Sequence, residues 1–521
     1  MSLQIKEFPG WLPFSQRGTL SRLHLNLHRA IMLRVGNFRN KATETGNGQD
    51  YLARFRRRLV IGLLLFGVSS SYLFFSIARG PRGMHGYPTD ELYALLATNF
   101  LQGKTALPIE PRPQLLSLPD PYDPEANWPY RLHEASLYKG RYYLYFGAVP
   151  AVTLFLPYRL VTGLDLPNRI AVPIFCIGGY LSSCALFFLL ARHNRWALPL
   201  WLECAIIVSL GSMSLVSVML RRPSFYEVAV AGGYFFVMAG FLALARATLV
   251  RHAHGKWLLL TGLLFGLSVG CRPHFVVICG IVLVAFALRA GRSPGPVIAM
   301  AAGMAACGIL LGWYNYVRFD NPLEFGRTYQ LTVFSSIPNS TYLGLELNPH
   351  ATLRSAKNFL FLAPQIDTTL PFLHTATIYP LMGRGGQPLW TEGMVGLIPA
   401  APFALLGLCL PLFLSRRLTA HRLVDELSVW LLYTMYWSGL AVLLVLCIVG
   451  WVLGRYLVDF AAIFTFGGVS VAAMLWQNIS GRPARLIFSC AVGAATVYGA
   501  VLNVAFATPS LESMLKFLRN S

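Results

Sequence analysis

The segment Arg56–Ala78, RRRLVIGLLLFGVSSSYLFFSIA, joins three arginines directly to a long apolar run. A run of about 20 apolar residues is the length that an α-helix needs to cross the hydrocarbon core of a bilayer. Residues 1–58 contain eleven Lys/Arg and three Asp/Glu, a net charge of +8. Because basic residues beside a span stay in the cytoplasm, we predict a basic cytoplasmic N-terminal arm (1–58) and a first helix that runs outward.

The composition extends this prediction to the whole chain. Of its 521 residues, 55% are hydrophobic and only 12% are charged, and the mean hydropathy is +0.54. A soluble domain carries about 25% charged residues. The sequence therefore predicts an all-α polytopic membrane protein. The net charge of +21 lies mainly in the arm and short loops, which indicates topology, and we expect no nucleic-acid partner. None of the nine cysteines has a CxxC spacing, so neither a zinc site nor a disulfide framework is indicated.

Eleven apolar runs are predicted to span the membrane, and two larger loops separate some of them. The loops at 79–142 and 318–392 are predicted to be extracytoplasmic. The transmembrane module 59–317 includes the first of these loops, the C-terminal helices occupy 393–507, and 508–521 forms an outer tail. The predicted spans are 59–78, 170–191, 197–219, 223–249, 256–271, 274–290, 296–317, 393–414, 427–450, 454–476 and 484–507.

The run at 144–162 is the exception among the apolar segments. The basic loops at 192–195, 251–256 and 289–292 can all be cytoplasmic only if one early run does not cross. Segment 144–162 is short, contains two prolines and has an arginine near its end. We therefore predict a re-entrant or surface-lying helix there.

The first loop opens with His85–Gly103, HGYPTDELYALLATNFLQG. Thr89 can cap a helix and Gly103 can end it. The apolar residues recur at helical spacing on one face, which predicts an amphipathic helix lying on the bilayer. That helix would hold the adjacent carboxylates Asp90 and Glu91 at the membrane surface. Further along, EASLYKGRYYLYFG predicts a β-hairpin around Lys139-Gly140.

Polar residues gather on the predicted outer face. A carboxylate can take a proton from an acceptor hydroxyl, and arginines can hold a lipid phosphate and stabilise charge on it as it departs. The first loop contributes Asp90, Glu91 and His85; the outer turns contribute Arg221, Arg222, Glu227, Arg272 and His274; and the second loop and a late helix contribute Arg318, Asp320, Glu324, Arg327, Arg455, Tyr456 and Asp459.

Structural roles are open for the same residues. Asp90 can favour a helix dipole, and Arg272 can extend to lipid head groups. Two ion pairs are also conceivable, Arg318 with Asp320 and Arg455 with Asp459, the latter at i, i+4. The histidines His85 and His274 are interpreted as polar loop residues rather than metal ligands, and Tyr142, Tyr143 and Tyr145 as an aromatic belt.

The order of these motifs resembles the glycosyltransferase C (GT-C) superfamily. The matching words are TDELYALLATNFLQGK (89–104), GLSVGCRPHF (266–275), GWYNYVRFDNPLEFG (312–326) and GRYLVDF (454–460), and the resemblance covers about residues 59–476. The chain is also similar to bacterial membrane proteins of the mannosyltransferase or lipopolysaccharide glycosyltransferase type.

The resemblance implies an activity and a set of site residues. Members transfer a sugar from a polyprenyl-phosphate-linked donor on the outer face, here to a lipid-linked or cell-envelope glycan, in a bacterial inner membrane. Asp90 matches the family's first-loop acidic residue, with Glu91 as its neighbour. Arg272 and Arg455 match positions that face the lipid phosphate, and Glu227 matches an acidic position. No cofactor is expected; a divalent metal remains an alternative that no motif indicates.

Two other functions use the same features. A transporter or flippase for lipid-linked glycans would need the arginines and a polar path across the membrane. A polymerase- or ligase-like enzyme with a lipid diphosphate donor would place its key groups in the second loop, at Arg327, Arg354, His374 or Arg384.

Overall fold

The computed structural model describes residues 48–78, 91–250, 254–291, 293–332, 348–366, 368, 373–382, 388–414 and 424–508. The predictions made for His85, Thr89, Asp90, Arg384 and most of the N-terminal arm lie outside these ranges.

Eight helices in the described part of the chain are long and apolar enough to cross a membrane. This confirms the prediction of an α-helical, multi-pass membrane protein. Two of the eight begin as short 3-10 turns, η3 (Pro273–Phe275) before α12 and η5 (Gly454–Leu457) before α20. The eight are α2 (Gly48–Ile77), α7 (Asn168–His193), α10 (Phe225–Leu249), α12 (Val276–Ala290), α13 (Pro294–Phe319), α19 (Glu426–Val449), α20 (Val458–Asn478) and α21 (Arg482–Ala507).

The three other predicted spans are shorter or broken. Run 256–271 forms the shorter helix α11 (His254–Cys271). Run 197–219 divides into α8 (Leu200–Ser212) and α9 (Ser217–Arg221), because Leu215 between them has a left-handed backbone with φ 62°. Run 393–414 divides into α15 (Leu397–Ala400), α16 (Pro402–Leu408) and α17 (Leu410–Phe413). Prolines in the first turns of α16 and α17 remove the N–H groups that a continuous helix would use.

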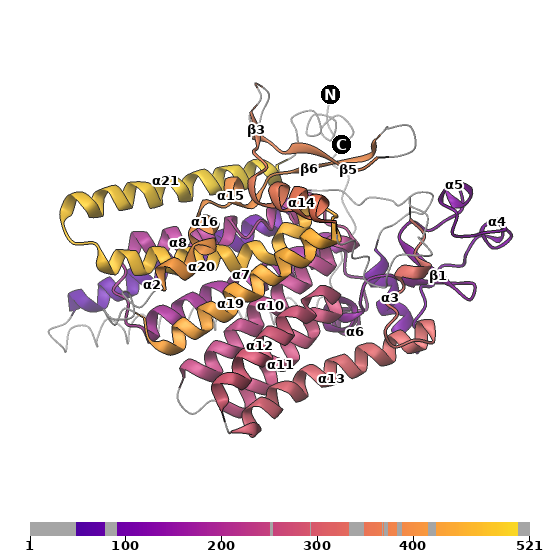
Figure 1. The fold of residues 1–521 in the computed structure, drawn as a ribbon, viewed down its shortest axis with the longest axis horizontal. Coiled ribbons are helices and arrows are strands. Elements are labelled where there is room, and N and C mark those ends of the chain that lie inside the picture. The colour runs from indigo at the N-terminus through magenta and orange to yellow at the C-terminus, as the bar shows by residue number, and fades with distance from the viewer. Residues whose placement is uncertain are drawn as a thin grey trace, which may run out of the picture. The chain divides into compact units, whose positions relative to one another are not determined.

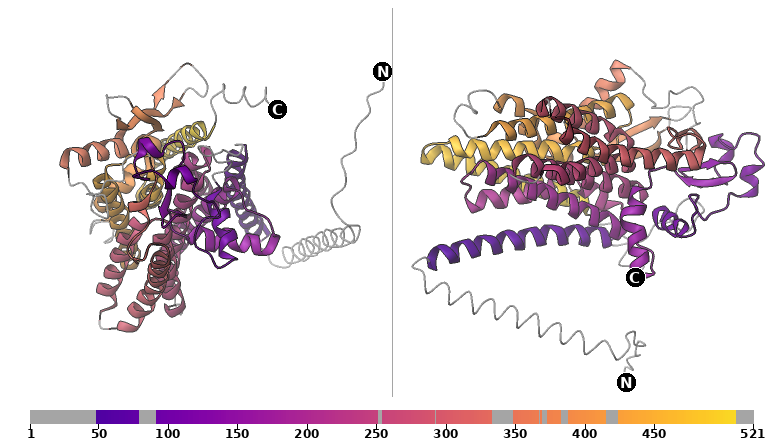
Figure 2. Two further views of the ribbon diagram at one scale, coloured as in Figure 1. Left: turned by 90° about the vertical axis from the view of Figure 1, so that its right-hand side faces the viewer. Right: turned by 90° about the horizontal axis from the view of Figure 1, so that it is seen from below.

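Within residues 64–521 the helices pack against one another, with α7 and α11 against α10, and α16 and α19 against α20 (Figure 1). Helix α20 is central, because its apolar stretch is wholly buried, whereas that of α13 is mostly exposed. The first-loop elements α3, α4, α5 and β1 lie together beyond one end of these helices (Figures 1 and 2). That end of the bundle carries the candidate site.

The first loop contains the predicted hairpin. Strands β1 (Ala135–Tyr138) and β2 (Arg141–Leu144) are antiparallel, and the turn residues Lys139 and Gly140 have φ values of 48° and 70°. Two positive φ values define the type I′ turn that matches the twist of a hairpin. The loop also contains the helices α3 (Leu92–Phe100), α4 (Pro113–Leu116) and α5 (Pro124–Asn127).

Helix α3 differs from its prediction in position and surroundings. It begins after Glu91, and Leu92 and Leu96 are fully buried inside the protein. The helix packs against β2, the π-helical turn η2 (Ala151–Phe155) and α6 (Leu156–Thr162). The prediction of a helix lying on the bilayer is therefore wrong for α3, because its apolar face is covered by protein.

The segment that was predicted not to cross contains a short helix. Residues 151–162 form twelve residues of helix, about 18 Å long at about 1.5 Å per residue, against a hydrocarbon core of about 30 Å. The Glu91 carboxylate accepts a 2.7 Å hydrogen bond from the backbone N–H of Asn168, which places the start of α7 beside the first loop. Both observations support a re-entrant segment, which remains a prediction.

The second loop contains β-structure that the sequence did not predict. Strands β3 (Gln365–Ile366) and β4 (Leu373–His374) form one antiparallel pair, and β5 (Ala376–Met382) and β6 (Pro388–Met394) form another. Helix α14 (Pro349–Phe361) precedes them, and the 3-10 turn η4 (Arg327–Tyr329) lies near the start of the loop. Just after η4, Leu331 exchanges backbone hydrogen bonds with Glu134 (2.8 Å) and Ala135 (2.9 Å), so the two loops are joined.

Candidate functional site

Two buried ion pairs meet at the end of the bundle next to the first loop. Arg272 follows α11, and its Nη2 lies 2.8 Å from Oδ2 of Asp459 in the first turn of α20. Both side chains are almost inaccessible, and His274 Nε2 lies 3.2 Å from the same carboxylate oxygen. Because an unpaired buried charge is very costly, the pair fixes the α11–α12 turn against α20.

The second pair joins Arg455 in η5 to Glu227 in α10. Arg455 Nη1 lies 3.9 Å from Glu227 Oε1. The other carboxylate oxygen of Glu227 accepts from the backbone N–H of Ser224 at 3.2 Å and from the Ser224 hydroxyl. This is a capping box at the start of α10, so Glu227 has a structural task as well as a charge partner.

These contacts correct two structural alternatives considered for the arginines. The i, i+4 pair between Arg455 and Asp459 is not formed, because Asp459 faces Arg272 and His274. Arg272 does not extend to lipid head groups, since its side chain is 7% exposed and ion-paired. Its Nε is buried and makes no hydrogen bond to any residue that the structure describes.

Aromatic rings cover both guanidinium groups. The Tyr456 ring centroid lies 4.5 Å from Cζ of Arg272 and 5.7 Å from Cζ of Arg455. Tyr226 covers Arg455 from α10 at 4.7 Å. A guanidinium stacked on a ring keeps its in-plane N–H donors directed to the side, which is the geometry for binding an oxyanion.

Glu134 completes the cluster from the first loop. Its carboxylate accepts a hydrogen bond from the side-chain amide of Gln330, and the hydroxyl of Tyr226 lies close enough to lower the pKa of Glu134. The side chain is only 17% exposed, and burial raises the pKa of Glu134 to about 7, although the charges of Arg455 and Arg131 oppose this rise. A carboxyl group with such a pKa exchanges protons near neutral pH.

Glu134 was not among the residues singled out from the sequence. It directly precedes β1, and neither its burial nor its left-handed backbone, φ 65°, has a signal in the local pattern. Tyr226 was missed for the same reason, because its partners come from distant segments. The one available signal was the position of Glu134 at the start of a predicted outer hairpin.

The tyrosines of β2 and its continuation do not form an aromatic belt. Tyr142 is fully buried, and its hydroxyl accepts from the backbone N–H of Leu132. Burial raises the pKa of Tyr145 to about 12, while the positive charges of Arg327 and Arg272 oppose the rise. Tyr145 and Arg327 therefore lie close to the ion-pair cluster.

Several other predicted site residues hold the loops together. Arg318 is buried and donates to the Leu144 carbonyl (2.7 Å) and to the Asn315 side chain (2.6 Å). The expected pair with Asp320 is not formed, because Asp320 accepts from Tyr138 (2.8 Å) and Lys139 (2.5 Å) of the hairpin.

Glu324 and Glu91 also have structural contacts. Glu324 accepts from the Gly326 N–H at 2.6 Å and from the Thr328 hydroxyl at 2.8 Å, which fixes the start of the second loop. Glu91 accepts from the first turn of α7, as described above. Arg222 is exposed at the end of α9. Of the predicted residues, the cluster thus contains Glu227, Arg272, His274, Arg455, Tyr456 and Asp459, with Arg327 nearby.

Two glycines allow the first loop to approach the bundle this closely. A Cβ on Gly147 would lie 1.9 Å from the carbonyl oxygen of Gly270, and a Cβ on Gly270 would lie 2.3 Å from Val149. Gly270 is two residues before Arg272. The glycine contact therefore brings Tyr145 and Arg272 to the same place.

The residues of the lipid-diphosphate alternative lie elsewhere or are exposed. Arg354 is exposed on α14, and His374 lines a separate hollow with Gln365 and Thr377. In the described part of the chain, no group of three or more His, Cys, Asp or Glu side chains is close enough to hold a metal ion.

Comparison with known proteins finds a structural similarity but no sequence match. No protein-family model matches the chain, and no curated protein matches it. A solved structure that resembles it is the crystal structure of the Archaeoglobus fulgidus oligosaccharyltransferase in the apo form, with a TM-score of 0.40 and 14% sequence identity. The match covers 88% of this chain, which spans 58% of the length of the archaeal chain.

Proposed function

We propose that this protein is a membrane glycosyltransferase of the GT-C type. It transfers a sugar from a polyprenyl-phosphate-linked donor to a lipid-linked or cell-envelope glycan, on the extracytoplasmic face of a bacterial inner membrane. The observation that carries the proposal is the cluster of Arg272 and Arg455, both stacked on Tyr456, next to the partly buried carboxyl group of Glu134. The order of sequence motifs supports the same function.

The arginines bind the lipid phosphate. Asp459 approaches one guanidinium nitrogen of Arg272, and the buried Nε of Arg272 makes no hydrogen bond to any described residue, so this arginine has a donor left for a phosphate oxygen. The carboxylates fix the guanidinium groups in place before the donor arrives. Preorganised donors of this kind stabilise the negative charge that develops on a leaving phosphate.

A first-loop carboxylate accepts the proton of the acceptor hydroxyl. Glu134 has the position and the proton affinity for this role among the described residues. Asp90 is the residue that the sequence motif assigns to it. In the step, the acceptor oxygen bonds to the anomeric carbon as its proton moves to the carboxylate. The bond between that carbon and the phosphate oxygen breaks, and its electron pair leaves with the lipid phosphate.

The test uses purified full-length protein, a labelled polyprenyl-phosphate-linked sugar and extracted envelope glycans. We expect release of polyprenyl phosphate, and Arg455→Gln should slow it at least 100-fold, because one preorganised donor is worth roughly 10²–10³ in rate. Arg485→Gln is the matched control, since Arg485 also stacks on an aromatic ring, Trp476, at 5.1 Å. Equal rates for the two variants would overturn the assignment of Arg455.

A further inference from the structure

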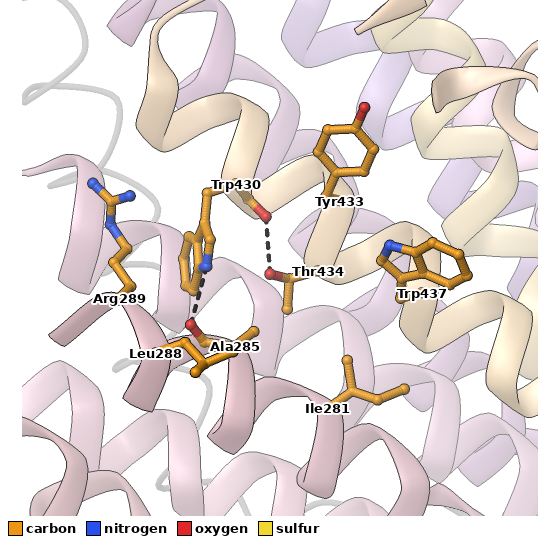
Figure 3. A pocket seen from close by; sticks show the side chains of 8 residues that line it. All are labelled: Ile281, Ala285, Leu288, Arg289, Trp430, Tyr433, Thr434 and Trp437. Atoms are coloured by element: carbon orange, nitrogen blue, oxygen red, sulfur yellow. Dashed lines mark hydrogen bonds between the residues drawn. The ribbon is translucent and has the colours of Figure 1, made fainter. Parts of the chain in front are cut away.

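A groove between α12 and α19 lies on the part of the bundle that the reaction does not use (Figure 3). Its volume is about 540 Å³, within the range of about 300–1,000 Å³ that small-molecule sites occupy. It is open to the outside of the bundle. The residues that line it are Ile281, Ala285, Leu288, Arg289, Trp430, Tyr433, Thr434 and Trp437.

The outer part of the groove is exposed apolar surface. The exposed fractions are 81% for Leu288 and 53% for Trp437. Both side chains belong to helices long and apolar enough to span the membrane. In a bilayer, such surface faces the lipid chains, and a hollow of about 540 Å³ has room for part of one.

One end of the groove is polar and positively charged. Arg289, in the last turn of α12, is the only charged residue among the eight that line it. Its guanidinium lies 5.7 Å from the ring centroid of Trp430. The Trp430 indole N–H donates to the Ala285 carbonyl at 3.2 Å, which fixes the ring between the two helices, as Figure 3 shows.

No acidic side chain is among the described residues that line the groove, so no groove residue neutralises Arg289. Two carboxylates, Asp425 and Glu426, lie at the same end of α19. Asp425 accepts from His193 at 2.7 Å and from the Ser428 N–H at 2.9 Å. Glu426 is exposed and is not one of the lining residues. An anionic head group therefore meets a positive charge at Arg289.

The length of the groove matches one leaflet. From Ile281 to Arg289 the helix rises about 12 Å, at about 1.5 Å per residue, and half of the hydrocarbon core is about 15 Å. From His274 to Arg289 the rise is about 22 Å on the same scale. Arg289 thus lies at the end of this span opposite to the Arg272 site.

We propose that this α12–α19 groove is a binding site for one anionic phospholipid, with its head group at Arg289 and an acyl chain along Ile281, Leu288 and Trp437. The site is separate from the reaction site, and its existence does not depend on the proposed glycosyl transfer. Trp430 positions the head group at the interface, as tryptophan does at membrane boundaries.

The test is native mass spectrometry of the purified full-length protein with equal amounts of phosphatidylglycerol and phosphatidylcholine. We expect one retained phosphatidylglycerol, at least tenfold weaker retention in Arg289→Gln, and retention close to wild type in Arg289→Lys. The matched control is Arg246→Gln, because Arg246 lies at the same distance, 5.7 Å, from the ring of Trp257 but does not line the groove.

Three results would overturn the proposal. Equal retention of the two lipids would indicate an unselective annular site. Equal losses in Arg289→Gln and Arg246→Gln would show that any basic residue at a membrane boundary has the same effect. The third result is preferential retention of an added polyprenyl phosphate over phosphatidylglycerol, to the same extent in the wild type and in Arg289→Gln. It would mean that the groove holds the tail of a prenyl lipid whose phosphate lies on the side of the Arg272 site.

Discussion

At the scale of single residues, Glu134 is the carboxyl group whose pKa the site raises to about 7. It connects the first loop to Gln330 in the second loop and to Tyr226 in α10. Burial stabilises its neutral form, while Arg455 stabilises the charged form. The balance gives the side chain both protonation states near neutral pH, which a general base needs to accept a proton and lose it again.

The pH profile of sugar transfer should reveal this group. With a pKa of about 7 for Glu134, the carboxyl group is protonated and inactive as a base below pH 7, so the rate should rise with pH and level off above 7. Glu134→Gln should slow transfer by about 10²–10⁴-fold, and its remaining activity should lack the inflection near pH 7.

The control for Glu134 is Glu324→Gln. Glu324 is also a buried carboxylate of an outer loop, but both of its oxygens accept hydrogen bonds within that loop. It should keep the inflection of the wild type. If Glu134→Gln kept the pH profile of the wild type and Asp90→Asn lost the inflection near pH 7, Asp90 would be the general base.

Asp459 should be important for stability as well as activity. Removing one partner of a buried ion pair costs about 3–5 kcal/mol, so Asp459→Asn should lower the free energy of unfolding by about that amount. The double variant Arg272→Met/Asp459→Leu should recover much of this loss, because apolar residues can replace a buried pair, yet it should remain inactive. Denaturation in detergent and the transfer assay measure the two effects.

The exposed ion pair between Lys139 and Asp320 is the control for the buried pair between Arg272 and Asp459. Exposed pairs contribute little, so Asp320→Asn should leave the unfolding transition where it is. If Asp320→Asn lowered the free energy of unfolding as much as Asp459→Asn does, burial would not be the reason for the effect of Asp459→Asn.

At the scale of elements, the site depends on the close approach of the first loop to the end of α11. Gly147→Ala should reduce both stability and activity, because the new Cβ would meet the Gly270 carbonyl oxygen at 1.9 Å and the backbone would have to move. Gly280→Ala in α12 is the control. It has open space around the new Cβ, and alanine favours a helix by about 1 kcal/mol. Thermal unfolding and transfer rates should separate the two variants.

Local patterns predicted the elements better than their contacts. The Lys139-Gly140 turn was predictable, because two alternating runs flank it, and the structure gives it the two positive φ values of a tight hairpin turn. The apolar runs predicted the long helices in the same way. The breaks near Leu215 and Pro402 were missed, since hydropathy along the chain does not show a change in helix direction.

The partners of the charged residues were not predictable from spacing. Arg455 and Asp459 are one turn apart, yet Asp459 pairs with Arg272 and His274 from another turn of the chain. Glu134 was missed because its environment comes from three segments distant in sequence. Burial and distant neighbours determine these roles, and a linear pattern contains neither.

At the scale of the whole molecule, the positive-inside interpretation places the ion-pair end outside. Single cysteines, in a background with the exposed Cys490 replaced by serine, can test it with a membrane-impermeant maleimide. Leu164→Cys and Arg221→Cys should react from the outside, and Arg192→Cys from the inside. All three positions are exposed. Reaction of Leu164→Cys from the inside alone would mean that segment 144–162 crosses the membrane.

The most direct test of the central claim is a transfer assay in proteoliposomes, with a polyprenyl phosphate labelled in the lipid and a sugar labelled separately. We predict that the wild-type protein separates the two labels, leaving polyprenyl phosphate and a sugar-bearing acceptor, and that Arg455→Gln does not. Movement of the intact donor across the bilayer, with both labels still joined, would show a flippase and contradict the assignment of a glycosyltransferase.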